Sequence, residues 1–102
     1  MASVGWTEEA EHWLSSIYDY IMADNPAAAE RVIMGIMDAA DRAADFPEAG
    51  YLYRRDGDFE IRIALYGHYR ITYAIQEGVG ILVLGVFHGA LDLDRYLHID
   101  FP

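Results

Sequence analysis

The sequence predicts an α+β domain: an N-terminal helical hairpin packs on an antiparallel sheet of three to four strands, and a short C-terminal helix follows. Two patterns predict this class. Apolar residues recur three and four positions apart over residues 8–45, and at alternate positions from residue 59 onward. With 102 residues, 54% of them hydrophobic, the chain has the size and composition of one small domain, so we assign residues 1–102 to a single unit.

A very short strand is expected at residues 3–6, followed directly by the first helix. Thr7 is a suitable N-cap, because its hydroxyl accepts a hydrogen bond from a free N–H of the first helical turn. Glu8 and Glu9 lie in that turn, where the helix dipole favours negative charge. Apolar residues at helical spacing give this helix one buried stripe, and we expect it to end near Ala23.

The second helix is predicted to begin after a link of two or three residues. Asn25 caps it, and Pro26 occupies its first position, where the missing N–H of proline costs nothing. Pro47 cannot continue the helix, which therefore ends near Asp45. Two helices joined by so short a link form an antiparallel hairpin.

The second half of the chain has the pattern of strands. Residues 59–65 and 69–75 each alternate apolar and polar side chains, which is typical of a strand with one apolar face. Residues 81–88 are apolar on both faces, as expected for an interior strand. Residues 51–56 form either a further strand or an extended segment that leads into the next strand. Asp56-Gly57, directly at its end, is a strong turn signal.

A strand register follows if the sheet buries only one face. The apolar faces of the first two meander strands must then coincide, which pairs Leu65 with Tyr69. The loop between them becomes the three residues Tyr66-Gly67-His68. In this register Arg62 and Arg70 both point away from the helical hairpin, so we expect an arginine-bearing surface on the open face of the sheet.

The charge of the chain excludes some partners. Seven arginines, no lysine and seventeen acids give a net charge of −10, which disfavours general attraction to nucleic acid or to an anionic membrane. Residues 51–75 carry a net charge of +1, so any anion-binding surface must come from them. The acidity is equally compatible with a solubility trait. No signal peptide and no apolar run of about 18 residues is visible, so we expect a cytoplasmic protein without a membrane segment.

The most informative stretch of the chain is residues 86–97, where an apolar strand ends in His88-Gly89-Ala90 and a short amphipathic helix follows. This ending resembles the C-terminal signature of the RelE/ParE superfamily of bacterial toxins, and it is most similar to the ParE branch of plasmid-stabilisation toxins. Further segments match the superfamily in order: Trp6–Ala10, Asn25–Ala29, Phe46–Gly50 and Tyr69–Tyr73.

The resemblance implies the toxin of a type II toxin–antitoxin module, neutralised by a cognate antitoxin with a ribbon-helix-helix-type DNA-binding domain. The toxin itself would not bind operator DNA. The ParE branch implies inhibition of DNA gyrase by protein–protein contact, without enzymatic activity. The RelE branch implies the alternative, a ribosome-dependent mRNA endoribonuclease. A third hypothesis is a detoxified relative that acts only as a binding module. No cofactor is expected.

Candidate site residues follow from the resemblance. Arg70 matches the arginine of the Tyr-Arg-Ile motif, which binds phosphate in the nuclease branch, so the nuclease alternative would use Arg70, Arg62 and His88 as catalytic residues. The basic residues that this branch carries after its last strand are missing here. A metal site at His88, Asp92 and Asp94 is rejected, because the spacing matches no established ligand pattern. For binding of a protein partner we expect Arg62, Arg70, His88, Leu91, Asp92, Arg95, Tyr96 and Leu97.

Overall fold

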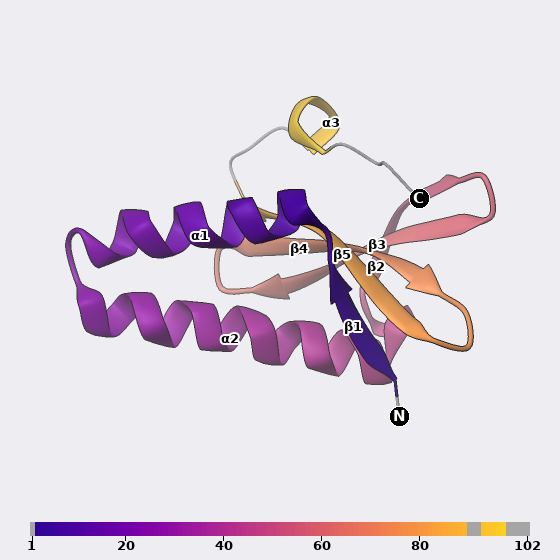
Figure 1. Ribbon diagram of the computed structural model, residues 1–102. Coiled ribbons are helices and arrows are strands. Elements are labelled where there is room, and N and C mark those ends of the chain that lie inside the picture. The colour runs from indigo at the N-terminus through magenta and orange to yellow at the C-terminus, as the bar shows by residue number, and fades with distance from the viewer. Residues whose placement is uncertain (1, 90–92, 98–102) are drawn as a thin grey trace.

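A hairpin of two helices lies against one face of a five-stranded sheet (Figure 1). The computed structural model describes residues 2–89 and 93–97. Helix α1 spans Glu8–Met22 and α2 spans Pro26–Asp45, followed by the 3₁₀ helix η1 at Pro47–Ala49. The predicted caps are confirmed: the Thr7 hydroxyl accepts from the Ala10 N–H at 3.0 Å, and the Asn25 side chain accepts from the Ala28 N–H at 3.2 Å.

The sheet has the strand order β1-β5-β4-β3-β2. Its strands are β1 Ser3–Trp6, β2 Tyr51–Asp56, β3 Phe59–Tyr66, β4 Tyr69–Gln76 and β5 Gly80–His88. Strand β1 runs parallel to β5, and every other pairing is antiparallel. The predicted α+β class and the interior position of β5 are confirmed. The count rises to five because β1 and β2 both join the sheet, one at each edge.

The predicted register between β3 and β4 is wrong by one residue. Tyr66 pairs with Tyr69 and Leu65 pairs with Arg70, so the loop is the two residues Gly67-His68. Gly67 has a φ of 57°, which suits the first position of a tight hairpin turn. A shift of one residue moves every side chain of a strand to the other face.

The physical reason for this register is that both faces of the sheet are buried. On the face of the helical hairpin, Ile71, Tyr73, Val83 and Val86 pack with residues of α2 that include Ile36. On the opposite face lie Ile61, Ile63, Leu84 and Phe87, together with Leu93 and Leu97 from the C-terminal segment.

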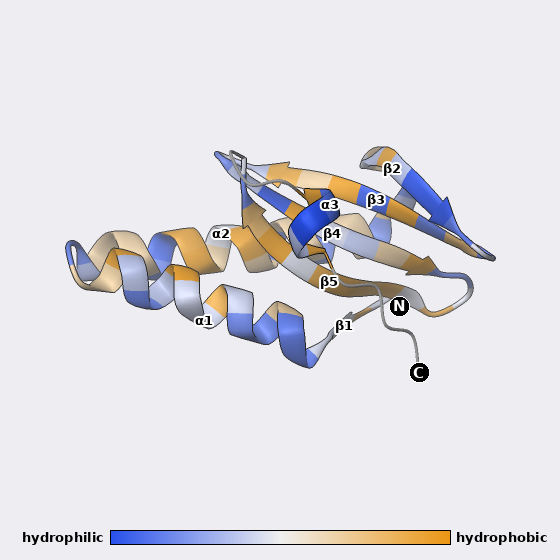
Figure 2. Ribbon diagram, turned by 90° about the horizontal axis from the view of Figure 1, so that it is seen from above, coloured by the Kyte–Doolittle hydropathy of each residue, from blue (hydrophilic) through white to orange (hydrophobic). Residues whose placement is uncertain are grey.

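The short helix α3, Leu93–Tyr96, lies over β4 and β5 (Figure 2) and covers this second face. The apolar sides of β3 and β4 therefore point in opposite directions, each into its own core. No helix in the described part of the chain combines the length and apolarity needed to cross a membrane.

Leu93→Ala tests whether α3 truly closes the second core. Because Leu93 is buried, we expect the substitution to lower the free energy of unfolding by about 2–3 kcal/mol. Arg95→Ala, on the exposed side of the same helix, should change it by less than about 0.5 kcal/mol. Urea unfolding of both variants measures the difference. Equal, small losses would show that the second face of the sheet is not sealed.

Candidate functional site

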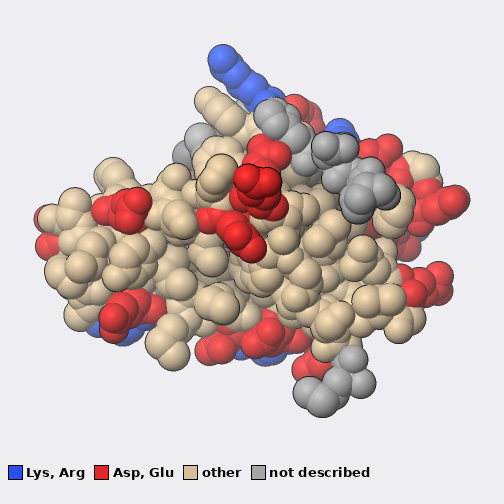
Figure 3. All heavy atoms as spheres, viewed as in Figure 1, with Lys and Arg blue, Asp and Glu red and all other residues tan. Residues whose placement is uncertain are grey.

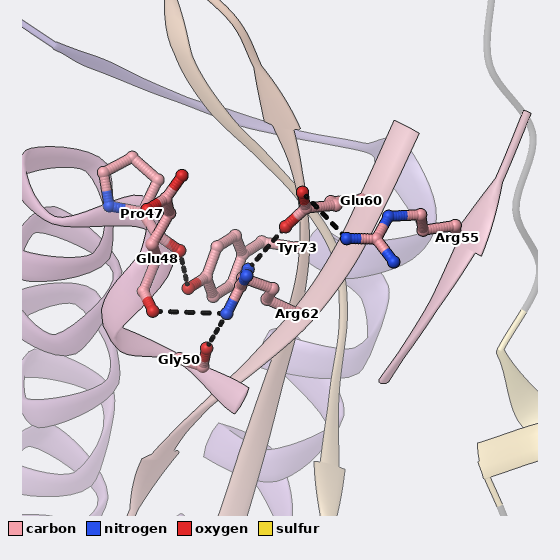
Figure 4. A network of polar contacts seen from close by, with 7 residues as sticks. All are labelled: Pro47, Glu48, Gly50, Arg55, Glu60, Arg62 and Tyr73. Carbon is pink, nitrogen blue, oxygen red and sulfur yellow. Dashed lines mark hydrogen bonds and ion pairs between the residues drawn. The ribbon is translucent and has the colours of Figure 1, made fainter. Parts of the chain in front are cut away.

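Arg62 is held inside a polar network of the protein's own chain (Figure 4). Its Nη1 donates to the carbonyl of Gly50 at 2.6 Å and to the carbonyl of Glu48 at 3.2 Å, and its Nε donates to Glu60 Oε1 at 2.8 Å. The side chain is only 17% exposed. Arg62 thus fastens the connection between α2 and β2 to the sheet, and its donor groups point inward.

Tyr73 completes this network from the neighbouring strand. Its hydroxyl donates to the carbonyl of Pro47 at 2.6 Å. A Cβ atom at Gly50 would collide with this hydroxyl and with the carbonyl of Ile63, so the close passage of the chain at this point requires glycine. Burial raises the pKa of Tyr73, whereas the hydrogen bond with the backbone of Gly50 and the charge of Arg62 act in the opposite direction.

Arg62 and Arg70 lie on opposite faces of the sheet, so the predicted shared arginine surface is wrong. Arg62 pairs with Tyr73, which belongs to the core under the helical hairpin. Arg70 pairs with Leu65 and with Phe87, which belongs to the core under α3. The error follows directly from the register, because the three-residue loop had placed the two guanidinium groups side by side.

Arg70 lies at an end of the sheet where two histidines meet. Its Nη2 is 3.5 Å from the carbonyl oxygen of His88. The rings of His68 and His88 stack with their centroids 6.0 Å apart, and Tyr69 meets the His88 ring edge-on at 5.8 Å. Both histidines are exposed. The structure therefore brings together Arg70 and His88 from the predicted set, and it adds His68, which belongs to the hairpin loop.

The predicted residues of the C-terminal segment divide into two groups. Leu97 is buried in the second core, so it serves the fold. Arg95 and Tyr96 are exposed on α3, with the guanidinium carbon 5.8 Å from the centre of the Tyr96 ring. The helix is anchored by a hydrogen bond from the Tyr53 hydroxyl to Asp94 Oδ1. Leu91 and Asp92 lie outside the described residues.

An apolar groove runs between α2 and the edge of the sheet formed by β2 and β3. Its volume is about 490 Å³, and α2 contributes Ala39, Ala43 and the residue after its end, Phe46. Phe46 and Leu65 are 69% and 60% exposed, which is unusual for large apolar side chains. The sequence analysis missed this groove because its walls come from segments that are distant in the chain.

The described residues, 2–89 and 93–97, contain no group of three or more His, Asp or Glu side chains placed to hold a metal ion. What they offer for chemistry is one arginine beside two histidines, and what they offer for binding is an apolar groove beside an open sheet edge.

Known proteins resemble this chain both in fold and in sequence. A chain of the chromosomal ParDE toxin–antitoxin system from P. aeruginosa superposes with a TM-score of 0.67 at 18% identity, over 86% of this chain and 96% of the other. Toxin RelE2 of Caulobacter vibrioides is 44% identical over 52 residues, which are 51% of this chain and 59% of the relative.

The class is therefore the RelE/ParE toxin superfamily. Residues 4–93 match the family described as the ParE toxin of the type II toxin–antitoxin system parDE, and the chain belongs to this family.

Replacing Arg62 and Arg55 in turn separates a structural arginine from a surface ion pair. Both contact Glu60, but Arg55 is 66% exposed and its Nη2 lies 3.6 Å from the carboxylate. Arg62→Ala removes the donor from the partly buried carbonyl of Gly50 and from the carbonyl of Glu48, and it removes the ion pair with Glu60, so we expect a loss of about 2 kcal/mol in the free energy of unfolding. Arg55→Ala should cost less than about 1 kcal/mol. Denaturant titration of both variants measures the two losses in the free energy of unfolding. Equal losses would show that Arg62 does not stabilise the connection between α2 and β2.

The raised pKa of Tyr73 predicts a specific loss of stability in alkaline solution. The unfolded chain ionises this tyrosine near pH ~10, whereas the folded protein keeps it protonated. Its contribution to the free energy of unfolding is therefore complete below pH ~10 and is lost as the pH rises through the pKa of Tyr73 in the folded protein. Near neutrality, Tyr73→Phe should be less stable than the wild type by about 1 kcal/mol, because the bond to Pro47 is lost.

The difference in the free energy of unfolding between the wild type and Tyr73→Phe should become smaller as the pH rises above ~10, because only the wild type has a Tyr73 hydroxyl that ionises. Urea unfolding of both proteins at each pH measures it, and the contributions of the other tyrosines cancel in the comparison. A constant difference across this range would mean that burial does not hold Tyr73 in its protonated form.

Proposed function

We propose that this chain is the toxin of a type II toxin–antitoxin module, that it inhibits DNA gyrase by protein–protein contact, and that a cognate antitoxin neutralises it. Membership of the ParE toxin family and the fold shared with a chain of a ParDE system support the proposal. Action on gyrase places the protein in the cytoplasm. The match to Toxin RelE2 spans 59% of that relative, so the activity is inferred from the family and from the site.

The separation of Arg62 from Arg70 is the observation that favours inhibition of gyrase over cleavage of mRNA. Cleavage of mRNA through the 2′-hydroxyl needs several cations around the developing charge on the phosphorus. Arg62 cannot join Arg70 there, because the sheet lies between them and the donors of Arg62 bind Glu48, Gly50 and Glu60. The net charge of −10 adds to this argument, because it repels RNA. Binding to a protein target requires neither feature.

The target-binding surface that we propose lies on the side of α3. Arg70 is on the sheet face that α3 covers, and Arg95 and Tyr96 are exposed on α3 itself. His88 extends this surface at the end of β5, and Leu91 and Asp92 would join it through the connecting segment. We assign Arg62 to the scaffold, where it positions the chain between α2 and β2.

The antitoxin would cover the apolar groove beside α2. A helix can lay its apolar face in such a groove, and an extended segment can add a strand to the open edge of β2. The ribbon-helix-helix domain of the antitoxin would supply binding to operator DNA. Covering Phe46, the most exposed of the large apolar side chains that line the groove, would remove apolar surface from water.

Expression of the chain without its antitoxin tests the proposal. We expect growth to stop, purified protein to abolish supercoiling by gyrase, and cellular mRNA to stay intact. Arg70→Ala should weaken inhibition of supercoiling about tenfold or more, because a charged contact at an interface is lost. Arg31→Ala, an exposed arginine on the outer side of α2, is the matched control and should leave inhibition unchanged.

The alternatives give different results in the same experiment. Transcript cleavage at the ribosomal A site would refute the gyrase mechanism and establish the endoribonuclease, for which the Arg70–His88 contact provides the candidate catalytic groups. Normal growth with folded protein, intact mRNA and active gyrase would identify a detoxified relative.

A further inference from the structure

A second concavity lies at the end of the sheet where the strand turns meet the end of α2. Its volume is about 1090 Å³, and it is bounded by residues 44–49, by the turn between β2 and β3, and by the turn between β4 and β5. We call it the acidic hollow. Five carboxylate residues line it: Asp45, Glu48, Asp58, Glu60 and Glu77.

The hollow carries a concentrated negative charge. No arginine and no lysine lines it. The C-terminal end of α2 adds the negative pole of a 20-residue helix at Asp45. Glu60 is paired with Arg55 and Arg62, and these are the only two salt bridges among the described residues, so neither involves the other four acids. Figure 3 shows acidic side chains gathered along the edge of the molecule that bears the strand turns.

The hollow is also apolar in its walls. Phe46, Phe59, Ile75 and Val79 line it, and Val79 is 56% exposed. Phe46 lines the acidic hollow and the groove beside α2 alike, so the two form one continuous surface. An exposed aromatic ring between an apolar groove and an acidic rim is complementary to a segment with apolar side chains in one part and positive charges in the next.

We propose that the acidic hollow receives a cationic part of the toxin-binding segment of the antitoxin, with lysine or arginine side chains over the rim and an apolar residue against Phe46 and Val79. This inference rests on the proposed function, since it specifies the chemistry of the partner that neutralises the toxin. A second copy of this chain, with its charge of −10, would be repelled from the hollow, and so would nucleic acid.

The electrostatics of this contact have two consequences. Four of the five acids, Asp45, Glu48, Asp58 and Glu77, are exposed, so their attraction for a cation comes from their number within one hollow and is screened by salt. Association should also be steered by charge, so that added salt slows binding and weakens affinity. An antitoxin segment with a net negative charge would meet repulsion from Asp45, Glu48, Asp58 and Glu77, whereas Glu60 is already paired with Arg55 and Arg62.

The binding test uses the purified full-length chain and a fluorescein-labelled amphipathic peptide of leucine and arginine, together with a twin peptide that carries glutamate at every arginine position. We expect the cationic peptide to bind with saturation and its affinity to fall with sodium chloride, and we expect the acidic twin not to bind. The triple variant Glu48→Gln/Asp58→Asn/Glu77→Gln should weaken binding about tenfold or more, as three cation contacts are lost.

Two matched controls separate a defined site from diffuse attraction. The variant Asp19→Asn/Asp24→Asn/Glu30→Gln removes three exposed acids at the far end of the helical hairpin, so it changes the net charge equally and should change the affinity less than about twofold. Phe46→Ala should weaken binding about fivefold by removing the apolar wall. Met34→Ala, which removes an exposed apolar residue of α2 outside both concavities, should not weaken binding.

Equal weakening by the two triple variants, or failure of the cationic peptide to bind, would overturn the inference. A second observation is the sequence of the cognate antitoxin: its toxin-binding segment should have a net positive charge, and a net negative charge would contradict the proposal. Peptide binding is measured without any toxic activity, so loss of the gyrase mechanism and loss of the acidic hollow as a docking site give separate results.

Discussion

The two-residue turn at Gly67-His68 is the constraint on which this structure depends. It sets the register between β3 and β4, and the register decides which side chains enter which core. In this register Ile61 and Ile63 point to the α3 side, whereas Ile71 and Tyr73 point to the helical hairpin. The sheet is therefore a central layer with a core on each side. Helix α3 becomes a structural element, because without it the second core would be open to water.

The same register determines what the arginines can do. Arg62 reaches back over the sheet to the backbone carbonyls of Glu48 and Gly50, where it fixes the passage from the last turn of α2 into β2. Arg70 is left near His88 at the opposite end of its own strand pair. A domain with dispersed cations and an acidic surface suits recognition of proteins better than recognition of RNA. Under our proposals, the groove and the acidic hollow are the places where an antitoxin would bind.

Much of the fold was predictable from the sequence because its signals are local. The caps Thr7 and Asn25, the ends of both helices and the interior strand β5 depend on neighbours within one or two turns. The register was not predictable in this way. Gly67 suits a two-residue loop and a three-residue loop alike, and the choice between them required knowing that α3 covers the second face. The partial burial of Arg62 was not predictable either, because its acceptors are backbone carbonyls 12 and 14 residues away. The family assignment does not depend on a shared arginine face, since it follows from the match over residues 4–93.

Engineered cysteine pairs test the register most directly, because the chain has no cysteine of its own. Leu65 and Arg70 are directly opposed, so in the double variant Leu65→Cys/Arg70→Cys the Cα atoms should be about 4.5–5.5 Å apart, within reach of a disulfide. In Leu65→Cys/Tyr69→Cys the side chains point to opposite faces. The account predicts rapid oxidation of the first variant and none of the second. Oxidation of the second variant alone would restore the three-residue loop, return Arg62 and Arg70 to one face and contradict the mechanism built on their separation.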